Sequence, residues 1–285
     1  MSGLKCPDKN NNKMKLAVSN VAWYPKQLES LIALLSLLGC DGIELAASMI
    51  WDEPVDSSRD DRLLVRRQIE DSGLKVTGLQ ALLYTRRELT IFGSGRRRAI
   101  DYLTKMMDMC RDLGGEVMVF GSPANRRIEG LNSDEAMAVA VDFFHELGTL
   151  AGERGVYFCI EPLGKTETNF INTVMDADEL IKKAGNPAGL GLHVDIKALI
   201  DEDEINALYI TDAFTRAKHV HVNDPELMPP GSMGFDSAHK IVNEKIKASG
   251  YSRYISIEMR RQEPDPEAAI RQAVKYVRAA YFGGL

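Results

Sequence analysis

Polar side chains stand at the points where four consecutive apolar segments of the second half of the sequence end. They are Glu161 in VYFCIEP, Asp195 in GLHVD, His221 in HVHVND and Glu258 in YISIEM. Three carboxylates that converge in a poorly solvated place repel one another unless a cation lies among them. Three oxygen donors and one imidazole suit Mn²⁺, Mg²⁺ or Co²⁺, with Zn²⁺ as a further option. The sequence therefore predicts a divalent-metal site formed by these four residues.

The elements that must position these residues follow a regular alternation of short apolar and longer amphipathic segments. The alternation runs along the whole chain and gives eight strand–helix units, the sixth of which has its expected helix in EDEINALYITDAF, residues 202–214. Apolar strands separated by helices indicate a parallel sheet, and eight units favour an α/β fold, the (β/α)8 TIM barrel. Glycines that match the left-handed residue at helix ends precede four of the strands: Gly73, Gly114, Gly155 and Gly250.

A barrel of this kind builds its active site at the C-terminal ends of its strands, which is where the four polar residues stand. In HVHVND, strand alternation points His219 and His221 to the same face and places His219 one pleat deeper inside the barrel. We therefore assign His221 to the rim with the carboxylates. We interpret His219, and His193 two residues before Asp195, as hydrogen-bonded residues of the barrel interior.

The composition is that of a soluble globular protein that acts on a small molecule. The 285 residues are 45% hydrophobic and 27% charged, and no linker or low-complexity run divides them. We expect one barrel domain over residues 14–285, after a frayed polar segment over residues 1–13. The net charge of -6 and a pI near 5.5 argue against a nucleic-acid partner. No GxGxxG motif follows the first strand, so nothing indicates a dinucleotide-binding fold.

The cysteine spacing and the absence of long apolar segments predict a cytoplasmic location. No CxxC pair occurs, so we expect reduced thiols, three of them buried and inert, among the four cysteines Cys6, Cys40, Cys110 and Cys159. The first residues lack the apolar core of a signal peptide, and no stretch reaches the roughly 18 apolar residues of a membrane span. We predict no membrane association and leave homo-oligomerisation open.

Several motifs taken jointly connect the chain to a known family. The segments IEPLGKTETNFINT, GLGLHVDIKAL, HVHVND followed by PPGSMGFD, and SGYSRYISIEM resemble the xylose-isomerase-like sugar phosphate isomerase/epimerase family. This family includes the ketose 3-epimerases and, more distantly, endonuclease IV, and the resemblance covers residues 15–282. It implies that Glu161, Asp195, His221 and Glu258 are the metal ligands. It also implies that Glu167, six residues after the first ligand, lies beside the substrate.

The resemblance implies a metal-dependent isomerase or epimerase of a sugar or sugar phosphate that transfers a proton next to a carbonyl. The metal would chelate the substrate and stabilise an enediolate, while Glu161 and Glu258 act as bases on opposite faces of one carbon. A dehydratase of a keto-cyclitol or related sugar derivative on the same barrel is the main alternative. A metal-free sugar-binding barrel and an abasic-site endonuclease are less favoured, because all four ligands are present and the chain is acidic and poor in histidine.

Two differences from the ketose epimerases predict that this protein binds its substrate through other residues. Those enzymes typically carry a histidine three residues after the aspartate ligand and an arginine six residues after the histidine ligand, where this chain has Ala198 and Leu227. In VFGSPANRR, Arg126 and Arg127 are candidates to hold a phosphate or carboxylate; the alternative is a solvated loop with two exposed arginines.

Further candidate substrate contacts lie after the first three strands and beside the aspartate ligand. Trp23, Trp51 and Tyr84 follow the first, second and third strands and either wall a sugar or pack at the rim. Lys197, two residues after Asp195, is a further predicted substrate-binding residue.

Overall fold

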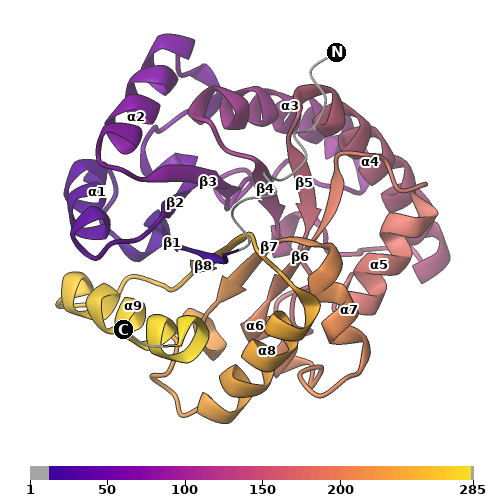
Figure 1. Ribbon diagram of the computed structural model, residues 1–285. Helices are drawn as coiled ribbons and strands as arrows, with labels where there is room; N and C mark the ends of the chain where they lie inside the picture. Colours follow the sequence, from indigo (N-terminus) through magenta and orange to yellow (C-terminus); the bar gives the residue numbers. More distant parts are fainter. Residues whose placement is uncertain (1–12, 284–285) are drawn as a thin grey trace.

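A computed structural model describes residues 13–283 of the chain. Its parallel strands close into a barrel in sequence order, because β1 pairs with β2 on one side and with β8 on the other. The strands lie at the centre and the helices surround them (Figure 1). This arrangement confirms the predicted (β/α)8 TIM barrel. Residues 1–12, which make up most of the segment expected to be frayed, lie outside the described residues.

Strands and helices alternate along the chain. The strands are β1 (Lys15–Ser19), β2 (Gly42–Ala46), β3 (Lys75–Gln80), β4 (Val117–Phe120), β5 (Tyr157–Ile160), β6 (Leu190–Asp195), β7 (Ala217–Val222) and β8 (Tyr254–Ile257). The helices are α1 (Leu28–Leu37), α2 (Arg59–Asp71), α3 (Arg96–Leu113), α4 (Ser133–Arg154), α5 (Val174–Lys183), α6 (Ile196–Asp201), α7 (Tyr209–Arg216), α8 (Asp236–Ser249) and α9 (Pro266–Phe282). Among the described residues, no helix combines the length and apolar character needed to cross a bilayer.

Local sequence signals set where several helices begin and end. Helices α2, α4 and α5 each start with a capping box, in which the side chain before the helix and an acidic side chain three residues later satisfy each other's backbone N–H groups. The predicted helix-ending glycines all have φ between 70° and 84°, a backbone conformation that costs other residues energy: Gly73, Gly114, Gly155 and Gly250.

The region between β6 and β7 differs from the single helix expected over residues 202–214. It contains two helices, α6 and α7, and the first begins directly after β6. The cause is Asp195, whose Oδ1 accepts the backbone N–H of Lys197 at 2.7 Å and so caps α6 at once. Asp203, with φ of 55°, lies between the two helices in the left-handed region. The helix prediction was therefore wrong about both the start and the continuity.

Aromatic packing fixes the strands that precede the candidate site. The rings of Phe120 on β4 and Phe158 on β5 lie 5.3 Å apart, and Phe144 of α4 packs against both, at 5.6 and 6.1 Å. All three side chains are buried, and such clusters contribute burial and favourable ring geometry together. The C-terminal ends of β4 and β5 therefore stand on a close-packed base.

The buried thiols match expectation. Cys40, Cys110 and Cys159 are free and buried, whereas Cys6 lies outside the described residues. Burial raises the pKa of Cys40 and of Cys159 to about 12, because the thiolate would lose its hydration. These thiols are therefore protonated and unreactive at neutral pH.

Candidate metal centre

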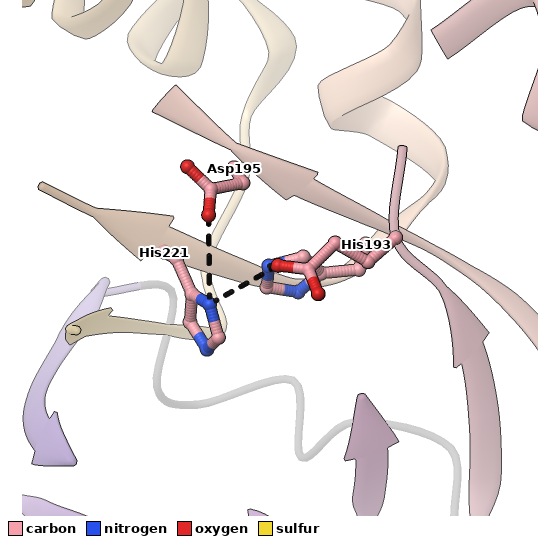
Figure 2. Close-up of side chains that lie close together, drawn as sticks. His193, Asp195 and His221 are labelled. Atoms are coloured by element: carbon pink, nitrogen blue, oxygen red, sulfur yellow. Dashed lines mark ion pairs between the residues drawn. The ribbon is translucent and has the colours of Figure 1, made fainter. Parts of the chain in front are cut away.

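The four predicted metal ligands come together at the C-terminal ends of β5 to β8. Nδ1 of His221 lies 3.5 Å from Oε1 of Glu161, 4.0 Å from Oδ2 of Asp195 and 3.1 Å from Oε2 of Glu258. Figure 2 shows one ring nitrogen of His221 directed at the Asp195 carboxylate, with the ring of His193 beside it. One imidazole nitrogen thus faces three carboxylates that come from three different strand ends.

Burial and mutual repulsion make this cluster unfavourable without a positive charge. Glu161, Asp195 and His221 are buried, while the side chain of Glu258 keeps 12% of its surface exposed. Burial and the charges of Glu161 and Glu258 raise the pKa of Asp195 to about 8. Burial likewise raises the pKa of Glu161. A cation among the carboxylates would relieve both effects.

The chemistry of the donors fits a divalent ion. Among the described residues, Nδ1 of His221 is a buried atom without a hydrogen-bond partner, which leaves it free to act as a ligand. Asp195 is already oriented, because the side-chain amide of Asn223 donates to its Oδ2 at 3.3 Å. Carboxylate oxygens with one imidazole are donors that Mn²⁺, Mg²⁺ and Co²⁺ accept.

Glu44 in the middle of β2 is a site residue that sequence reasoning missed. Its side chain is fully buried, with Oε2 2.9 Å from Nε2 of His221 and Oε1 3.2 Å from Nε2 of His219. Burial alone raises the pKa of Glu44, but His221 and His219 lower it well below its ordinary value, so the carboxylate is ionised. The available signal was Glu44 itself, the one carboxylate within the apolar run GIELA, residues 42–46. His219 lies one pleat deeper than His221, as predicted, but its Nε2 does not form the expected hydrogen bond within the described residues.

His193 occupies a different role from the hydrogen-bonded one expected. It is buried, its Nε2 lies 3.5 Å from Oε1 of Glu161, and its ring centroid is 4.1 Å from that of His221. Within the described part of the chain, neither of its ring nitrogens has a hydrogen-bond partner. Burial and the other histidines lower the pKa of His193 well below its ordinary value, so the ring is neutral. Its donor atom belongs to a group, with Glu161, Asp195 and His221, whose ligand atoms lie within 4.8 Å of one another.

Residues after β4 hold Glu161 in place. A Cβ atom on Gly121 would lie 2.1 Å from Oε2 of Glu161, so a larger residue there would displace that carboxylate from its present position. Arg126 is fully buried, and its Nη1 donates to the main-chain carbonyl of Glu161 at 2.6 Å. Burial lowers the pKa of Arg126 to about 10. These contacts favour support of the β5 end over the predicted substrate contact for Arg126.

The other predicted substrate residues after β4 to β6 form a linked polar group. Arg127 is exposed, and its Nη2 donates to the main-chain carbonyl of Glu167 at 3.1 Å. Nζ of Lys197 lies 2.5 Å from Oε2 of Glu167 and 2.8 Å from Oδ2 of Asp201. Glu167 and Lys197 are therefore joined in one ion-pair network at the outlets of β5 and β6.

The aromatic candidates divide into buried and exposed residues. Trp23 is buried, and its Nε1 donates to Oγ of Ser30 at 2.9 Å, which is the rim packing given as an alternative. Trp51 is partly buried against the core. Tyr84 is 79% exposed in the loop after β3 and is free to contact a ligand.

Comparison with known proteins agrees with this fold. A family model described as xylose isomerase-like TIM barrel matches residues 32–280, and the chain belongs to this family. Within it, the chain is 24% identical over 282 residues to 3-dehydro-D-guloside 4-epimerase of Escherichia coli (strain K12). That match covers 93% of this chain and 99% of the relative.

Solved structures of two sugar epimerases share the fold. D-psicose 3-epimerase from Clostridium cellulolyticum H10 superposes with a TM-score of 0.78 at 16% identity, over 94% of this chain and 99% of that one. 3-Keto-D-glucoside 4-epimerase from E. coli superposes with a TM-score of 0.75 at 21% identity, over 94% of this chain and 100% of that one. At these identities the likeness carries the fold, and the site argument rests on the residues of this chain.

Proposed function

We propose that the protein is a divalent-metal-dependent sugar epimerase. The observation that carries the proposal is the convergence of three carboxylates on the unpartnered Nδ1 of His221, in a barrel whose relatives include named sugar epimerases. Glu161, Asp195, His221 and Glu258 would hold the ion. A bound divalent cation would polarise the substrate carbonyl and so acidify the neighbouring C–H bond.

Glu161 and Glu258 are the proposed proton-transfer groups. One carboxylate takes the proton from the carbon next to the carbonyl, the C–H bonding electrons form a C=C bond, and the carbonyl oxygen takes the negative charge of an enediolate. The other group, protonated as a carboxylic acid and lying on a different side because β5 and β8 are separated by β6 and β7, gives its proton to the opposite face, and the C=C electrons form the new C–H bond as the carbonyl re-forms.

A keto-glycoside is the substrate class that we favour over a free ketose. The relative that matches almost end to end is named for a 3-dehydro-guloside. Ala198 and Leu227 stand where ketose epimerases typically carry a histidine and an arginine, so this chain lacks two of their substrate contacts. The Glu167–Lys197 pair instead offers polar groups for sugar hydroxyls. The buried thiols suit a reducing, cytoplasmic compartment.

Deuterium exchange tests the proposal for any substrate of this class, whichever epimer is formed. The protein is stripped with a chelator, reloaded with Mn²⁺, Mg²⁺ or Co²⁺, and incubated in D₂O with 3-keto-glycosides and free ketoses. NMR should show deuterium at the carbon beside the carbonyl, and the epimer, only with metal present. The same panel run with Glu204→Gln is the control, since Glu204 is a buried carboxylate that caps α5 at Val174 and contacts Tyr209.

The possible results separate the competing functions. Loss of water from the substrate instead of epimer formation would favour the dehydratase. Absence of both exchange and bound metal would favour a sugar-binding barrel. Cleavage of abasic-site DNA at the rate of a repair enzyme would replace the sugar substrate altogether.

A further inference from the structure

Glu44 poses a physical question that the proposed reaction leaves unanswered. A carboxylate with no exposed surface in the middle of a strand loses its hydration and needs hydrogen-bond donors in return. Within the described residues, its side-chain hydrogen bonds and ion pairs go to two ring nitrogens, Nε2 of His221 and Nε2 of His219. Both histidines lie on β7, whereas Glu44 lies on β2. The contact therefore crosses the barrel interior, because β1 and β8 separate these strands in the sheet.

The groups around the His221 ring decide which of its two nitrogens carries a proton. Both carboxylate oxygens of Glu44 lie at hydrogen-bond distance from Nε2 of His221, at 3.1 and 2.9 Å, and a carboxylate oxygen accepts, so Nε2 donates. A histidine that binds a metal is neutral, so its lone pair is then on Nδ1. That atom faces Glu161, Asp195 and Glu258, which are acceptors as well. A lone pair among carboxylate oxygens is the arrangement that a metal ion completes.

His219 steadies the carboxylate from a second direction. Its Nε2 lies 3.2 Å from Oε1 of Glu44, and its ring plane is turned 83° from that of His221. The two rings thus approach Glu44 from different directions: the His221 ring is hydrogen-bonded to the carboxylate, and the His219 ring, whose Nε2 has no hydrogen-bond partner among the described residues, limits how far the carboxylate can turn. This arrangement gives each histidine of HVHVND a role. His221 would bind the metal, and His219 would contact the carboxylate that orients His221.

We propose that Glu44 is a positioning residue that holds His221 in the Nε2–H tautomer, making Nδ1 the metal ligand, and that His219 in turn orients Glu44. The proposal rests on the proposed metal-dependent function. A carboxylate behind a histidine ligand fixes the ring and increases its basicity, and its loss typically lowers metal affinity about 10- to 100-fold.

The tautomer can be measured in the unaltered protein. Protein with ¹⁵N-labelled histidine is loaded with Zn²⁺, a diamagnetic ion, and long-range ¹H–¹⁵N correlation identifies the protonated nitrogen of each ring. The His221 signals are assigned from the spectrum of His221→Asn. We expect a protonated Nε2 and an Nδ1 shift that moves on metal addition. A protonated Nδ1 in the metal-loaded protein would overturn the proposal.

Metal affinity of a conservative variant gives the second readout. Glu44→Gln keeps the size and one oxygen acceptor but removes the charge, so we expect the Kd for Mn²⁺, followed by EPR, to rise about 10- to 100-fold. Ser256→Ala is the matched control. Ser256 pairs in register with His221 and is buried, and its hydroxyl has no hydrogen-bond partner among the described residues. Its Kd should stay within about twofold.

The outcomes distinguish this proposal from the proposed function. Unaltered protein that binds no divalent ion contradicts the function itself. Unaltered protein that binds Mn²⁺ while Glu44→Gln binds it equally well contradicts only the role of Glu44. If Glu44→Gln does not fold, the tautomer measurement decides, because it needs no change at Glu44.

Discussion

The two halves of the barrel differ in whether the polar side chains at their strand ends are satisfied within the chain. At the ends of β1 to β3 the polar groups are neutral and satisfied. The Gln80 side chain donates to Oγ of Ser19 at 2.6 Å, and Asn20 both accepts from and donates to the backbone of Ala46. At the ends of β5 to β8 the groups are carboxylates and an imidazole whose facing atoms do not satisfy one another.

This difference indicates which strand ends carry polar groups that the chain does not satisfy by itself. Neutral donors and acceptors can form hydrogen bonds with one another, so the polar groups at the ends of β1 to β3 are satisfied once the protein has folded. Three converging carboxylates, two of them buried, cannot do so, because carboxylate oxygens are acceptors and their charges repel one another. Glu44 is the exception in the first half, because its carboxylate is hydrogen-bonded to His221 and lies 3.2 Å from Nε2 of His219, and both histidines belong to β7.

The largest effect that would sharpen the comparison is expected from Glu258→Gln. The change keeps one oxygen donor but removes the basic lone pair and the charge, so kcat should fall by about 10² to 10⁴-fold. Metal binding should weaken only in part, since Glu161, Asp195 and His221 remain. Steady-state kinetics on folded, metal-loaded protein measures this. Turnover within a few-fold of the unaltered enzyme would remove Glu258 and the two-base mechanism.

Asp224, in the second half of the barrel, carries a charge that hydrogen bonds within the chain satisfy, and we expect this charge to stabilise the fold. Asp224, after β7, accepts from Nε2 of His239 at 2.8 Å and from the backbone N–H groups of Gly231 and Met233 at 3.2 and 2.8 Å. Asp224→Ala removes the acceptor of the buried His239 ring and of two backbone N–H groups, so the free energy of unfolding should fall by about 3 kcal/mol. Urea unfolding measures it. A loss below about 0.5 kcal/mol, typical of a surface change, would contradict the prediction.

The same residue gives a pH dependence with a definite sign. Burial raises the pKa of Asp224, but His239 and the two backbone N–H groups lower it further, to below its ordinary value of 3.8. Its contribution to stability is therefore fully present above about pH 4 and is lost as the pH falls through the lower folded pKa. Asp224→Asn, which cannot ionise, should lack this part of the acid unfolding curve.

A glycine of the first half tests how closely β4 supports the second. In Gly121→Ala the new Cβ would lie 2.1 Å from Oε2 of Glu161, so that carboxylate must move. A displacement of about 1 Å can cost up to about 100-fold in rate, and we expect kcat and Mn²⁺ affinity to fall together. The melting temperature should change little. Unchanged kinetics would show that Glu161 has room to shift without consequence.

Sequence reasoning reached the barrel and the four strand-end residues because both depend on local patterns. Apolar segments mark the strands, and a polar residue where a segment stops marks the rim. The roles of Glu161, Asp195, His221 and Glu258 stay predictions, although the structure brings them together. The prediction of one helix over residues 202–214 was wrong, because the Asp195 side chain caps a separate helix, α6, directly after β6.

The contacts that were missed join distant parts of the chain. Glu44 and His221 are 177 residues apart, and no local pattern shows that they meet across the barrel. Arg126 was predicted to hold a phosphate or carboxylate or else to lie exposed in a loop, yet it is buried and its Nη1 donates to the carbonyl of Glu161. His193 was given a hydrogen bond that it lacks within the described residues, since strand alternation predicts its direction but not its partners.

The smallest effect is expected from Gln80→Ala, at the neutral end of the barrel. The change removes the hydrogen bond to Oγ of Ser19 and a buried amide, so the free energy of unfolding should fall by about 1 kcal/mol. Because Gln80 belongs to a network that the protein completes by itself, kcat and Mn²⁺ affinity should stay within about twofold. Ser19→Ala alone and combined with Gln80→Ala would show whether the two losses are coupled, as partners in one hydrogen bond should be. If Gln80→Ala instead lowered kcat more than about tenfold while the metal stayed bound, the neutral end would take part in the chemistry. The division between a self-sufficient half and a metal-requiring half would then fail.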